Sequence, residues 1–115
     1  MSRLTTHVLD LFHGRPAEGV PLRLCQAESK EILVEDRTDA AGRAVCTPRG
    51  KEPLSGGRYE LVFAIGSYFA QGGVALADPP FLDEIVIRFG MSGTTDPYHI
   101  PLLVTPWSYT IYRGR

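Results

Sequence analysis

The stretches that decide the fold are Leu4-Thr5-Thr6-His7-Val8-Leu9-Asp10 near the start of the chain and Tyr98-His99-Ile100-Pro101-Leu102-Leu103 near its end. Both stretches have the period-2 alternation that is typical of β-strands with one buried face. Strands that are distant in sequence can lie side by side in one sheet, so His7 and His99 can share a site. Histidine is the side chain best suited to proton transfer near neutral pH.

Other short apolar runs lie between these two, and the 21 Gly and Pro residues of the 115-residue chain separate them. The predicted strands are residues 4–12, 20–25, 32–35, 58–63, 85–89, 97–104 and 107–113. Thr105-Pro106 predicts a tight antiparallel hairpin between the last two. Ser67–Gln71 fits a short helix that Ser67 caps and Gly72-Gly73 ends. We therefore expect an all-β, eight-stranded β-sandwich with one short helix, built as a single domain over residues 1–115.

The alternation also predicts which side chains face inward. The larger apolar set of each strand is expected to fill the core, and in the last strand this set is Trp107, Tyr109 and Ile111. The residues expected together on one outer face of the sandwich are His7, His99, Thr110 and Tyr112. A partly apolar sheet face with a few convergent polar groups often marks an interface or a ligand site.

Composition argues against several classes of function. The net charge of −1 supplies no basic field, so we expect no nucleic-acid partner. No apolar run approaches the ~20 residues of a membrane helix, and residues 1–12 are too polar for a secretory signal, so we expect no membrane partner and a cytoplasmic location. Cys25 and Cys46 form no C-x-x-C motif and are expected to be small buried apolar residues, and the three histidines lack metal-ligand spacing, so we expect no metal site.

Five stretches together resemble one known family. They are Leu4–Asp10, Gly14-Arg15-Pro16-Ala17, Gly57-Arg58-Tyr59-Glu60-Leu61, Tyr98–Leu103 and the terminal Tyr112-Arg113-Gly114. They are similar to the transthyretin-like 5-hydroxyisourate hydrolases of urate breakdown, and the similarity runs from residue 4 to residue 114. Transthyretin proper shares the fold but lacks both histidines and the Tyr-Arg-Gly ending, so this sequence resembles the enzymes of the family rather than transthyretin itself.

The resemblance implies a homotetramer that is a dimer of dimers. Two sandwiches would join edge to edge through their last strands, and two such pairs would face each other across a central channel that holds the active sites. It also implies hydrolysis of 5-hydroxyisourate to 2-oxo-4-hydroxy-4-carboxy-5-ureidoimidazoline, a step of purine catabolism, with no metal or organic cofactor.

The resemblance further assigns roles to individual residues. By position, His7, Arg43 and His99 match the family's catalytic residues, with Arg43 following the turn glycine Gly42. The residues implied to bind the substrate are Tyr112, Arg113, Gly114 and Arg115. Either histidine can be the general base, while Arg43 can stabilise developing negative charge and Arg113 can clamp the planar ring. His13, beside a turn glycine, is expected to be solvated and to have no role.

Two departures from the family pattern keep alternatives open. Arg115 stands where the family has serine, and Ala41 stands where it commonly has an aspartate, which is expected to loosen the loop that carries Arg43. One alternative is a non-enzymatic transthyretin-like protein that binds a small planar ligand. Another is a paralogue that hydrolyses a related cyclic ureide.

Overall fold

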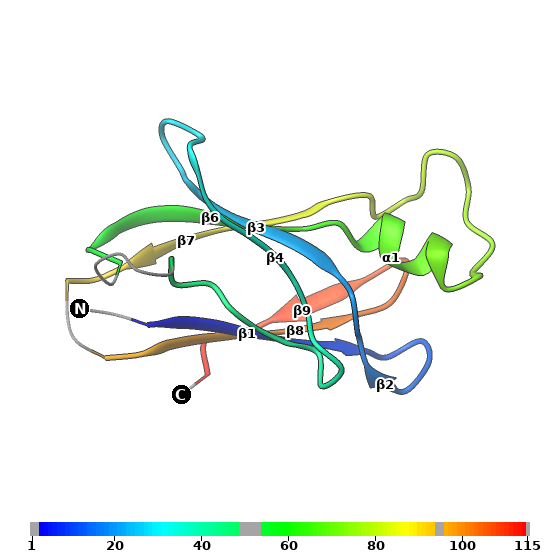
Figure 1. Ribbon diagram of the computed structural model, residues 1–115. Helices are drawn as coiled ribbons and strands as arrows, with labels where there is room; N and C mark the ends of the chain where they lie inside the picture. Colours follow the sequence, from blue (N-terminus) through cyan, green and yellow to red (C-terminus); the bar gives the residue numbers. More distant parts are fainter. Residues whose placement is uncertain (1–2, 49–53, 94–95, 115) are drawn as a thin grey trace.

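Two β-sheets pack face to face, with one helix at an end of the sandwich (Figure 1). The computed structural model describes residues 3–48, 54–93 and 96–114. The first sheet contains β1 (Leu4–Asp10), β2 (Arg15–Pro16), β5 (Arg43–Val45), β8 (Tyr98–Val104) and β9 (Tyr109–Ile111). The second contains β3 (Pro21–Gln26), β4 (Ile32–Arg37), β6 (Gly57–Phe63) and β7 (Ile85–Met91). The all-β sandwich predicted from the sequence is therefore confirmed.

The strand order shows how the two ends of the chain meet. The first sheet runs β2-β1-β8-β9, and β5 shares with β2 the edge of β1 that faces away from β8. The second sheet runs β4-β3-β6-β7 and is antiparallel throughout. The described residues form nine strands rather than eight, because the two-residue strand β2 pairs with the end of β1. The predicted antiparallel hairpin is β8–β9.

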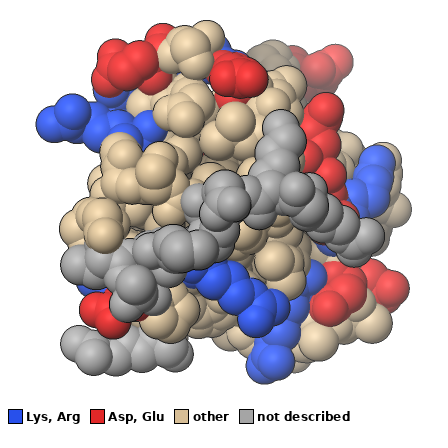
Figure 2. All heavy atoms as spheres, turned by 60° about the vertical axis from the view of Figure 1, so that its left-hand side comes forward, with Lys and Arg blue, Asp and Glu red and all other residues tan. Residues whose placement is uncertain are grey.

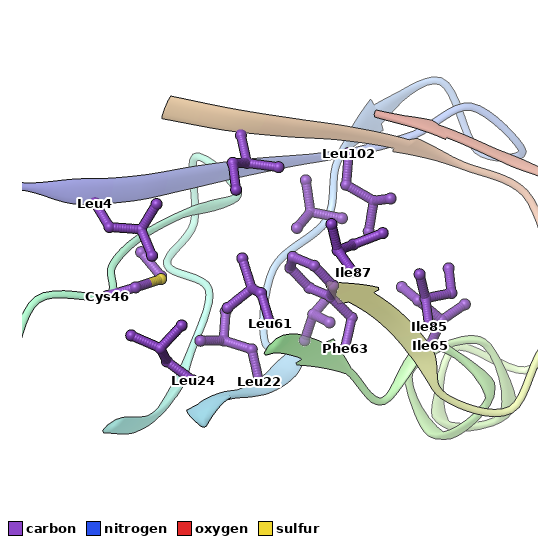
Figure 3. Packing of buried hydrophobic residues seen from close by; sticks show 14 of the residues in the cluster. Leu4, Leu22, Leu24, Cys46, Leu61, Phe63, Ile65, Ile85, Ile87 and Leu102 are labelled. Carbon is purple, nitrogen blue, oxygen red and sulfur yellow. The ribbon is translucent and has the colours of Figure 1, made fainter. Parts of the chain in front are cut away.

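Alternation along β1 and β8 separates a buried face from an accessible one. Leu4, Thr6 and Val8 are fully buried, while Thr5, His7 and Leu9 on the other face are half-buried. Figure 3 shows Leu4 and Leu102 meeting Leu22, Leu61 and Phe63 of the second sheet in the space between the layers. Burial of such side chains contributes ~25 cal/mol per Å² of apolar surface. The core therefore holds the two sheets together, and the side chains on the outer face of β1 and β8 remain available to contact other molecules.

The last strand departs from the sequence prediction. Trp107 is 57%, Tyr109 43% and Ile111 37% exposed, so none of the three is in the core. Strand β9 has three residues and lies at the edge of its sheet, with β8 as its neighbour. Alternation correctly placed Tyr109 and Ile111 on the inner side, opposite Val104 and Leu102, but it could not reveal that these side chains remain partly exposed at the edge of the sheet.

The helix also begins earlier than predicted. Helix α1 spans Ile65–Gln71, and Ala64 is its N-cap without a side-chain hydrogen bond. Ser67 therefore lies inside the helix and does not cap it. The end was predicted correctly, because Gly72 is the C-cap and Gly73 has a φ of +86°. Ile65 and Phe69 anchor the helix, since both are fully buried.

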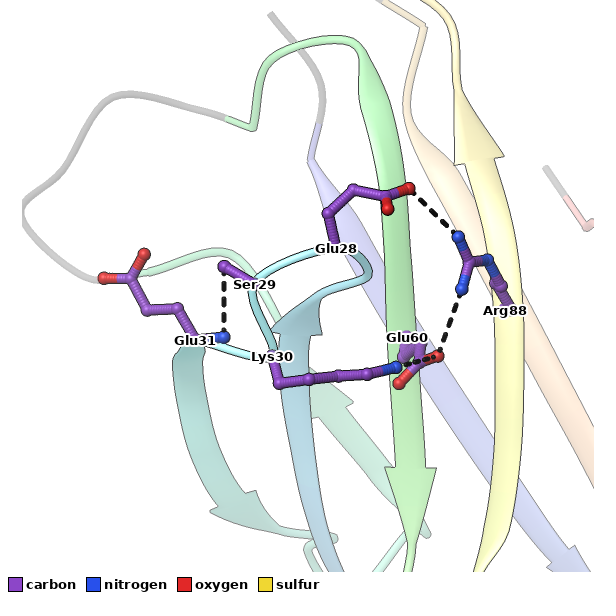
Figure 4. A network of polar contacts seen from close by, with 6 residues as sticks. All are labelled: Glu28, Ser29, Lys30, Glu31, Glu60 and Arg88. Carbon is purple, nitrogen blue, oxygen red and sulfur yellow. Dashed lines mark hydrogen bonds and ion pairs between the residues drawn. The ribbon is translucent and has the colours of Figure 1, made fainter.

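Ion pairs cover part of the outer face of the second sheet. The Glu60 carboxylate forms ion pairs with Lys30 at 2.9 Å and with Arg88 at 3.7 Å. Arg88 forms a second ion pair with Glu28 at 3.0 Å (Figure 4). On the end of the sandwich drawn in Figure 2, Lys and Arg side chains are mixed with Asp and Glu rather than gathered into a field of one sign. This agrees with the net charge of −1.

A buried carboxylate ties the first sheet to the helix. Asp10 is 1% exposed, and it accepts hydrogen bonds from the His13 backbone N–H at 2.8 Å and from the Tyr68 hydroxyl at 2.7 Å. The His13 ring lies with Nδ1 2.6 Å from the same carboxylate and stacks beside Phe69. His13 is exposed, as predicted, but the turn after β1 also brings its imidazole back onto Asp10, a contact that the sequence did not reveal.

The hydrogen bonds change the titration of this group. Burial raises the pKa of Asp10, but the bonds from His13 and Tyr68 together outweigh burial and hold the pKa below its ordinary value of 3.8. Burial and the bond to Asp10 raise the pKa of Tyr68 to about 12. Ionised Asp10 therefore contributes stability that is complete above its ordinary pKa and is lost as the pH falls through the lower folded-state value.

Both cysteines are buried and free, as expected for small apolar residues. Burial raises the pKa of the Cys46 thiol to about 12, so this side chain stays protonated at neutral pH. No helix within the described ranges is long and apolar enough to cross a membrane.

The Asp10 cluster yields a stability prediction. Asp10→Asn should lower the free energy of unfolding by about 1–3 kcal/mol at pH 7, because an amide cannot accept all of the buried hydrogen bonds. The difference from wild type should begin to narrow below pH 3.8, where the unfolded chain takes up the proton, and should narrow further as the pH falls through the lower pKa of folded Asp10. Urea unfolding at one fixed protein concentration measures both effects. Asp83→Asn is the matched control, since Asp83 is exposed. Equal losses in the two variants would contradict a special contribution from Asp10.

Candidate active site

Strand pairing brings the predicted catalytic residues onto one face of the first sheet. In the parallel β1–β8 pair, Thr5 lies opposite His99 and His7 lies opposite Pro101. In the antiparallel β1–β5 pair, His7 lies opposite Arg43. Because side chains alternate between faces, His7, His99 and Arg43 all project from the outer face. The two histidines are half-buried and Arg43 is exposed.

The His99 ring is held through its Nδ1 atom. The Thr5 hydroxyl oxygen lies 2.8 Å from Nδ1, so the two groups share one hydrogen bond. A hydroxyl can donate or accept, and the bond is compatible with either neutral tautomer. In both cases Nε2 is the ring nitrogen that remains for a substrate or a water molecule.

The His7 ring is held by a backbone carbonyl. Its Nε2 lies 2.9 Å from the Ala41 oxygen. A carbonyl oxygen only accepts hydrogen bonds, so Nε2 must carry the hydrogen. In the neutral ring the lone pair is then on Nδ1, which is the nitrogen that can accept a proton.

A tight turn presents Arg43 beside His7. The Asp39 carboxylate accepts hydrogen bonds from the Ala41 and Arg43 backbone N–H groups, each at 2.9 Å. Gly42 has a φ of +78°, and a Cβ there would lie 2.4 Å from the Val8 carbonyl oxygen, so only glycine fits. The Arg43 N–H bond, followed by the Ala41 bond and the positive charge of Arg43, lowers the pKa of Asp39 despite partial desolvation. Ala41 was expected to loosen this loop, but Asp39 supplies the hydrogen bonds that hold it.

A surface depression of about 620 Å³ lies beside Arg43 and His99, and His7 is not among the residues that line it. Its lining includes Arg3, Thr5, Asp39, Arg43, Val45 and His99. Arg3 and Arg43 provide guanidinium donors, which suit the carbonyl and oxyanion oxygens of a small planar molecule. Within the described ranges, no three His, Cys, Asp or Glu side chains converge to hold a metal ion.

The C-terminal motif divides between two places. The Gly114 N–H donates to the His99 carbonyl at 2.6 Å, and the two residues form an isolated antiparallel bridge. Tyr112 and Arg113 instead line a small apolar groove of about 110 Å³ with Ile87 and Phe89. Arg115 lies outside the described residues. Within one chain, Gly114 therefore reaches His99, and neither Tyr112 nor Arg113 is among the residues that line the depression.

Two residues of the site escaped the sequence analysis. Thr5 lies two residues before His7, so alternation places both side chains on the same face of the sheet. This pattern already indicated that Thr5 can contact a residue of the adjoining strand, and that residue is His99. Asp39 precedes the turn glycine by three residues, a position where aspartate commonly bonds to backbone N–H groups ahead of it. Neither residue belongs to a motif of the family resemblance, but Thr5 bonds to the His99 ring and Asp39 bonds to the backbone of Arg43.

Comparisons with known proteins agree with this geometry. The model of the HIUase/Transthyretin family matches residues 4–114. The 5-hydroxyisourate hydrolase of Caulobacter vibrioides is 47% identical over 116 residues, which cover 99% of each chain. The structure of the 5-hydroxyisourate hydrolase of Klebsiella pneumoniae superposes with a TM-score of 0.83, at 35% identity and over the full length of both chains.

A crystal structure of an (S)-allantoin synthase superposes with a TM-score of 0.88 at 40% identity. The match covers 99% of this chain but only 44% of that one, so it relates this chain to one part of a longer protein. The family match spans almost the whole chain and includes both histidine-bearing strands, and it shows that this chain belongs to the HIUase/Transthyretin family.

Proposed function

We propose that this protein hydrolyses 5-hydroxyisourate to 2-oxo-4-hydroxy-4-carboxy-5-ureidoimidazoline in urate degradation. The observation that carries the proposal is the strand register, which sets His7 opposite Arg43 and places His99 on the adjoining strand of the same face. Full-length relatives with the name 5-hydroxyisourate hydrolase support the choice of substrate. The Gly42 turn and the Asp39 carboxylate support a fixed position for the Arg43 backbone.

The reaction needs three things from the protein. Water must lose a proton as its oxygen bonds to the ring carbonyl carbon, the carbonyl oxygen must carry negative charge, and the ring nitrogen must gain a proton as the C–N bond breaks. An imidazole can take the first proton and return one to the leaving nitrogen, which typically accelerates such reactions ~10²–10⁴-fold. In this site each ring offers one nitrogen, namely Nδ1 of His7 and Nε2 of His99.

Arg43 is the proposed partner of the developing oxyanion. Its guanidinium is always charged and donates several hydrogen bonds in one plane, so it can hold negative charge without exchanging a proton. Arg43 lies opposite His7 in the register and lines the same depression as His99. The proposed mechanism therefore uses side chains of this chain, and it requires no cofactor.

We also propose that the last four residues bind the substrate, as the family resemblance of the sequence implies. Gly114 supports it most directly, because its backbone bonds to His99. The substrate contacts proposed for Tyr112, Arg113 and Arg115 would be made in the assembled oligomer. A cytoplasmic location likewise stays a prediction from the sequence.

We also propose a homotetramer arranged as a dimer of dimers. Strand β9 is an edge strand on which Tyr109 and Ile111 are exposed, as is Trp107 just before it, and unpaired edges of this kind favour pairing with another chain. The outer face that bears the histidines also carries the half-buried Leu9 and Leu103, which lie opposite each other in β1 and β8. Pairing through β9 and apposition of two such faces would cover both surfaces and enclose the depression.

The activity prediction follows from these roles. The wild-type protein should accelerate the decay of freshly made 5-hydroxyisourate, followed by ultraviolet absorbance, well above the spontaneous rate. His7→Gln and His99→Gln should each lower kcat/KM by about 10²-fold or more, through loss of proton transfer. Arg43→Met should lower it by about 10²–10³-fold, through loss of the oxyanion donor. Arg58→Met, an exposed arginine on β6 of the other sheet, is the control and should retain full activity.

The same assay tests the terminal residue. If wild type and Arg115→Ser both accelerate the decay, then serine is dispensable at this position. If only Arg115→Ser is active, the scaffold is a hydrolase whose ending has altered its function. If neither variant exceeds the spontaneous rate, the proposed activity is wrong and binding of a planar ligand becomes the better hypothesis.

The tetramer proposal makes a separate prediction about mass. Sedimentation equilibrium of the wild type should give four times the chain mass of 12.7 kDa. Leu103→Asp should reduce this to twice the chain mass, because a carboxylate on the half-buried outer face would oppose apposition of two dimers. Val86→Asp, on an exposed position of β7, should leave the mass unchanged. A wild-type protein that sediments as a monomer at micromolar concentration would exclude the tetramer.

A further inference from the structure

The imidazole of His99 is enclosed on two of its edges. The Thr5 hydroxyl lies 2.8 Å from Nδ1. On the opposite side of the ring stands Gly114, and a Cβ built on this residue would lie 3.1 Å from His99 Cδ2. That distance is shorter than an ordinary van der Waals contact, so the C-terminal backbone sits directly against the ring. The edge that remains open carries Cε1 and Nε2.

The contact depends on where the chain end is held. Gly114 belongs to no named strand, and among the described residues its backbone N–H connects it to β8 by donating to the His99 carbonyl at 2.6 Å. A residue outside a strand ladder keeps a fixed position only when its neighbours are also attached. The ring contact therefore depends on how the residue next to Gly114 is held.

Arg113 makes that second attachment. Its guanidinium carbon lies 4.0 Å from the centroid of the Tyr98 ring, which is the geometry of a cation–π interaction. The Tyr98 ring is itself held in place. The residue is 6% exposed, and its hydroxyl oxygen accepts a hydrogen bond from the Ser92 backbone N–H at 2.9 Å.

The two attachments lie on opposite faces of the sheet. Tyr98 and His99 are consecutive in β8, and so are Arg113 and Gly114 in the C-terminal segment. Since side chains alternate along a strand, Tyr98 and Arg113 meet on the inner side while Gly114 meets His99 on the outer side. Arg113 is turned away from the depression that holds His99 and Arg43, and so it is poorly placed in this chain to clamp a substrate there.

We infer that Arg113 is a positioning residue that acts on His99 through Tyr98 and Gly114. By stacking on Tyr98 it holds Gly114 against the imidazole, and Thr5 holds the opposite edge, so that Nε2 is directed to the open face. The inference rests on the proposed function, because it assigns His99 to proton transfer. It replaces the role of ring clamp that the family resemblance implies for Arg113.

Substitution of Arg113 separates positioning from substrate binding. Arg113→Met keeps the length of the side chain and removes the charge, whereas Arg113→Lys retains a cation over the ring. For Arg113→Met we expect kcat to fall roughly 10- to 100-fold, as for a misplaced catalytic group, with KM changed less than about twofold. Arg113→Lys should recover part of that loss. Arg58→Met is the matched control and should leave kcat and KM unchanged.

Two measurements on the protein without substrate report the mechanism directly. In the ¹H–¹³C spectrum of the histidine rings, the His99 signals should shift and broaden in Arg113→Met, while the His7 signals should stay in place. Hydrogen exchange of the Gly114 amide should become faster, because its bond to the His99 carbonyl opens more often. Tyr98→Leu should reproduce both changes, and its combination with Arg113→Met should add little to either.

The outcomes distinguish this inference from the proposed function. A rise in KM with unchanged kcat, unchanged His99 signals and unchanged Gly114 exchange would show that Arg113 binds substrate and would overturn the inference. If the wild type fails to hydrolyse 5-hydroxyisourate, the proposed function fails. The ring spectrum and the amide exchange would still decide whether Arg113 holds the C-terminal segment against His99.

Discussion

The parallel pairing of β1 with β8 is the constraint on which the rest of this structure depends. It joins the two ends of the chain over their full strand length, from Leu4 opposite Tyr98 to Asp10 opposite Val104. All other pairings within the described residues are antiparallel, and most join strands that are near in sequence. This one pairing therefore closes the first sheet, and it also decides which residues can share a site (Figure 1).

Register and burial are linked in this pair. Leu4, Val8 and Leu102 point into the core, and Thr6 joins them by donating its hydroxyl to the Ile100 carbonyl at 2.6 Å. A slip of one residue would turn these side chains outward and bring His7 and His99 into the core. The apolar face thus fixes the register, and the register fixes the distance between the catalytic candidates. The core residues therefore determine where His7 and His99 lie, although they do not contact either ring.

The sequence alone predicted the parts of the fold that depend on local periodicity. The alternation around His7 and His99, the hairpin after Val104 and the turn before Arg43 were all accessible in this way. What escaped prediction depends on contacts made after folding. The exposure of Trp107, whose ring meets Phe12 at a centroid distance of 5.7 Å, depends on which segments cover the connection between β8 and β9. Similarly, His13 is drawn to Asp10 by a turn whose course a polar loop composition does not reveal.

The same reasoning explains why the family resemblance and the geometry differ over the C-terminal motif. A motif assigns a common role to adjacent residues, but adjacent residues on an extended segment point to opposite faces of the sheet. Gly114 lies against His99, whereas Arg113 lies over Tyr98, so one motif serves two surfaces. A glycine at the catalytic side lets the backbone approach the imidazole, and an arginine at the core side fastens that backbone to a buried ring. The segment after β9 can therefore complete the candidate site on one face of the sheet while its neighbour is attached to a core residue on the other face.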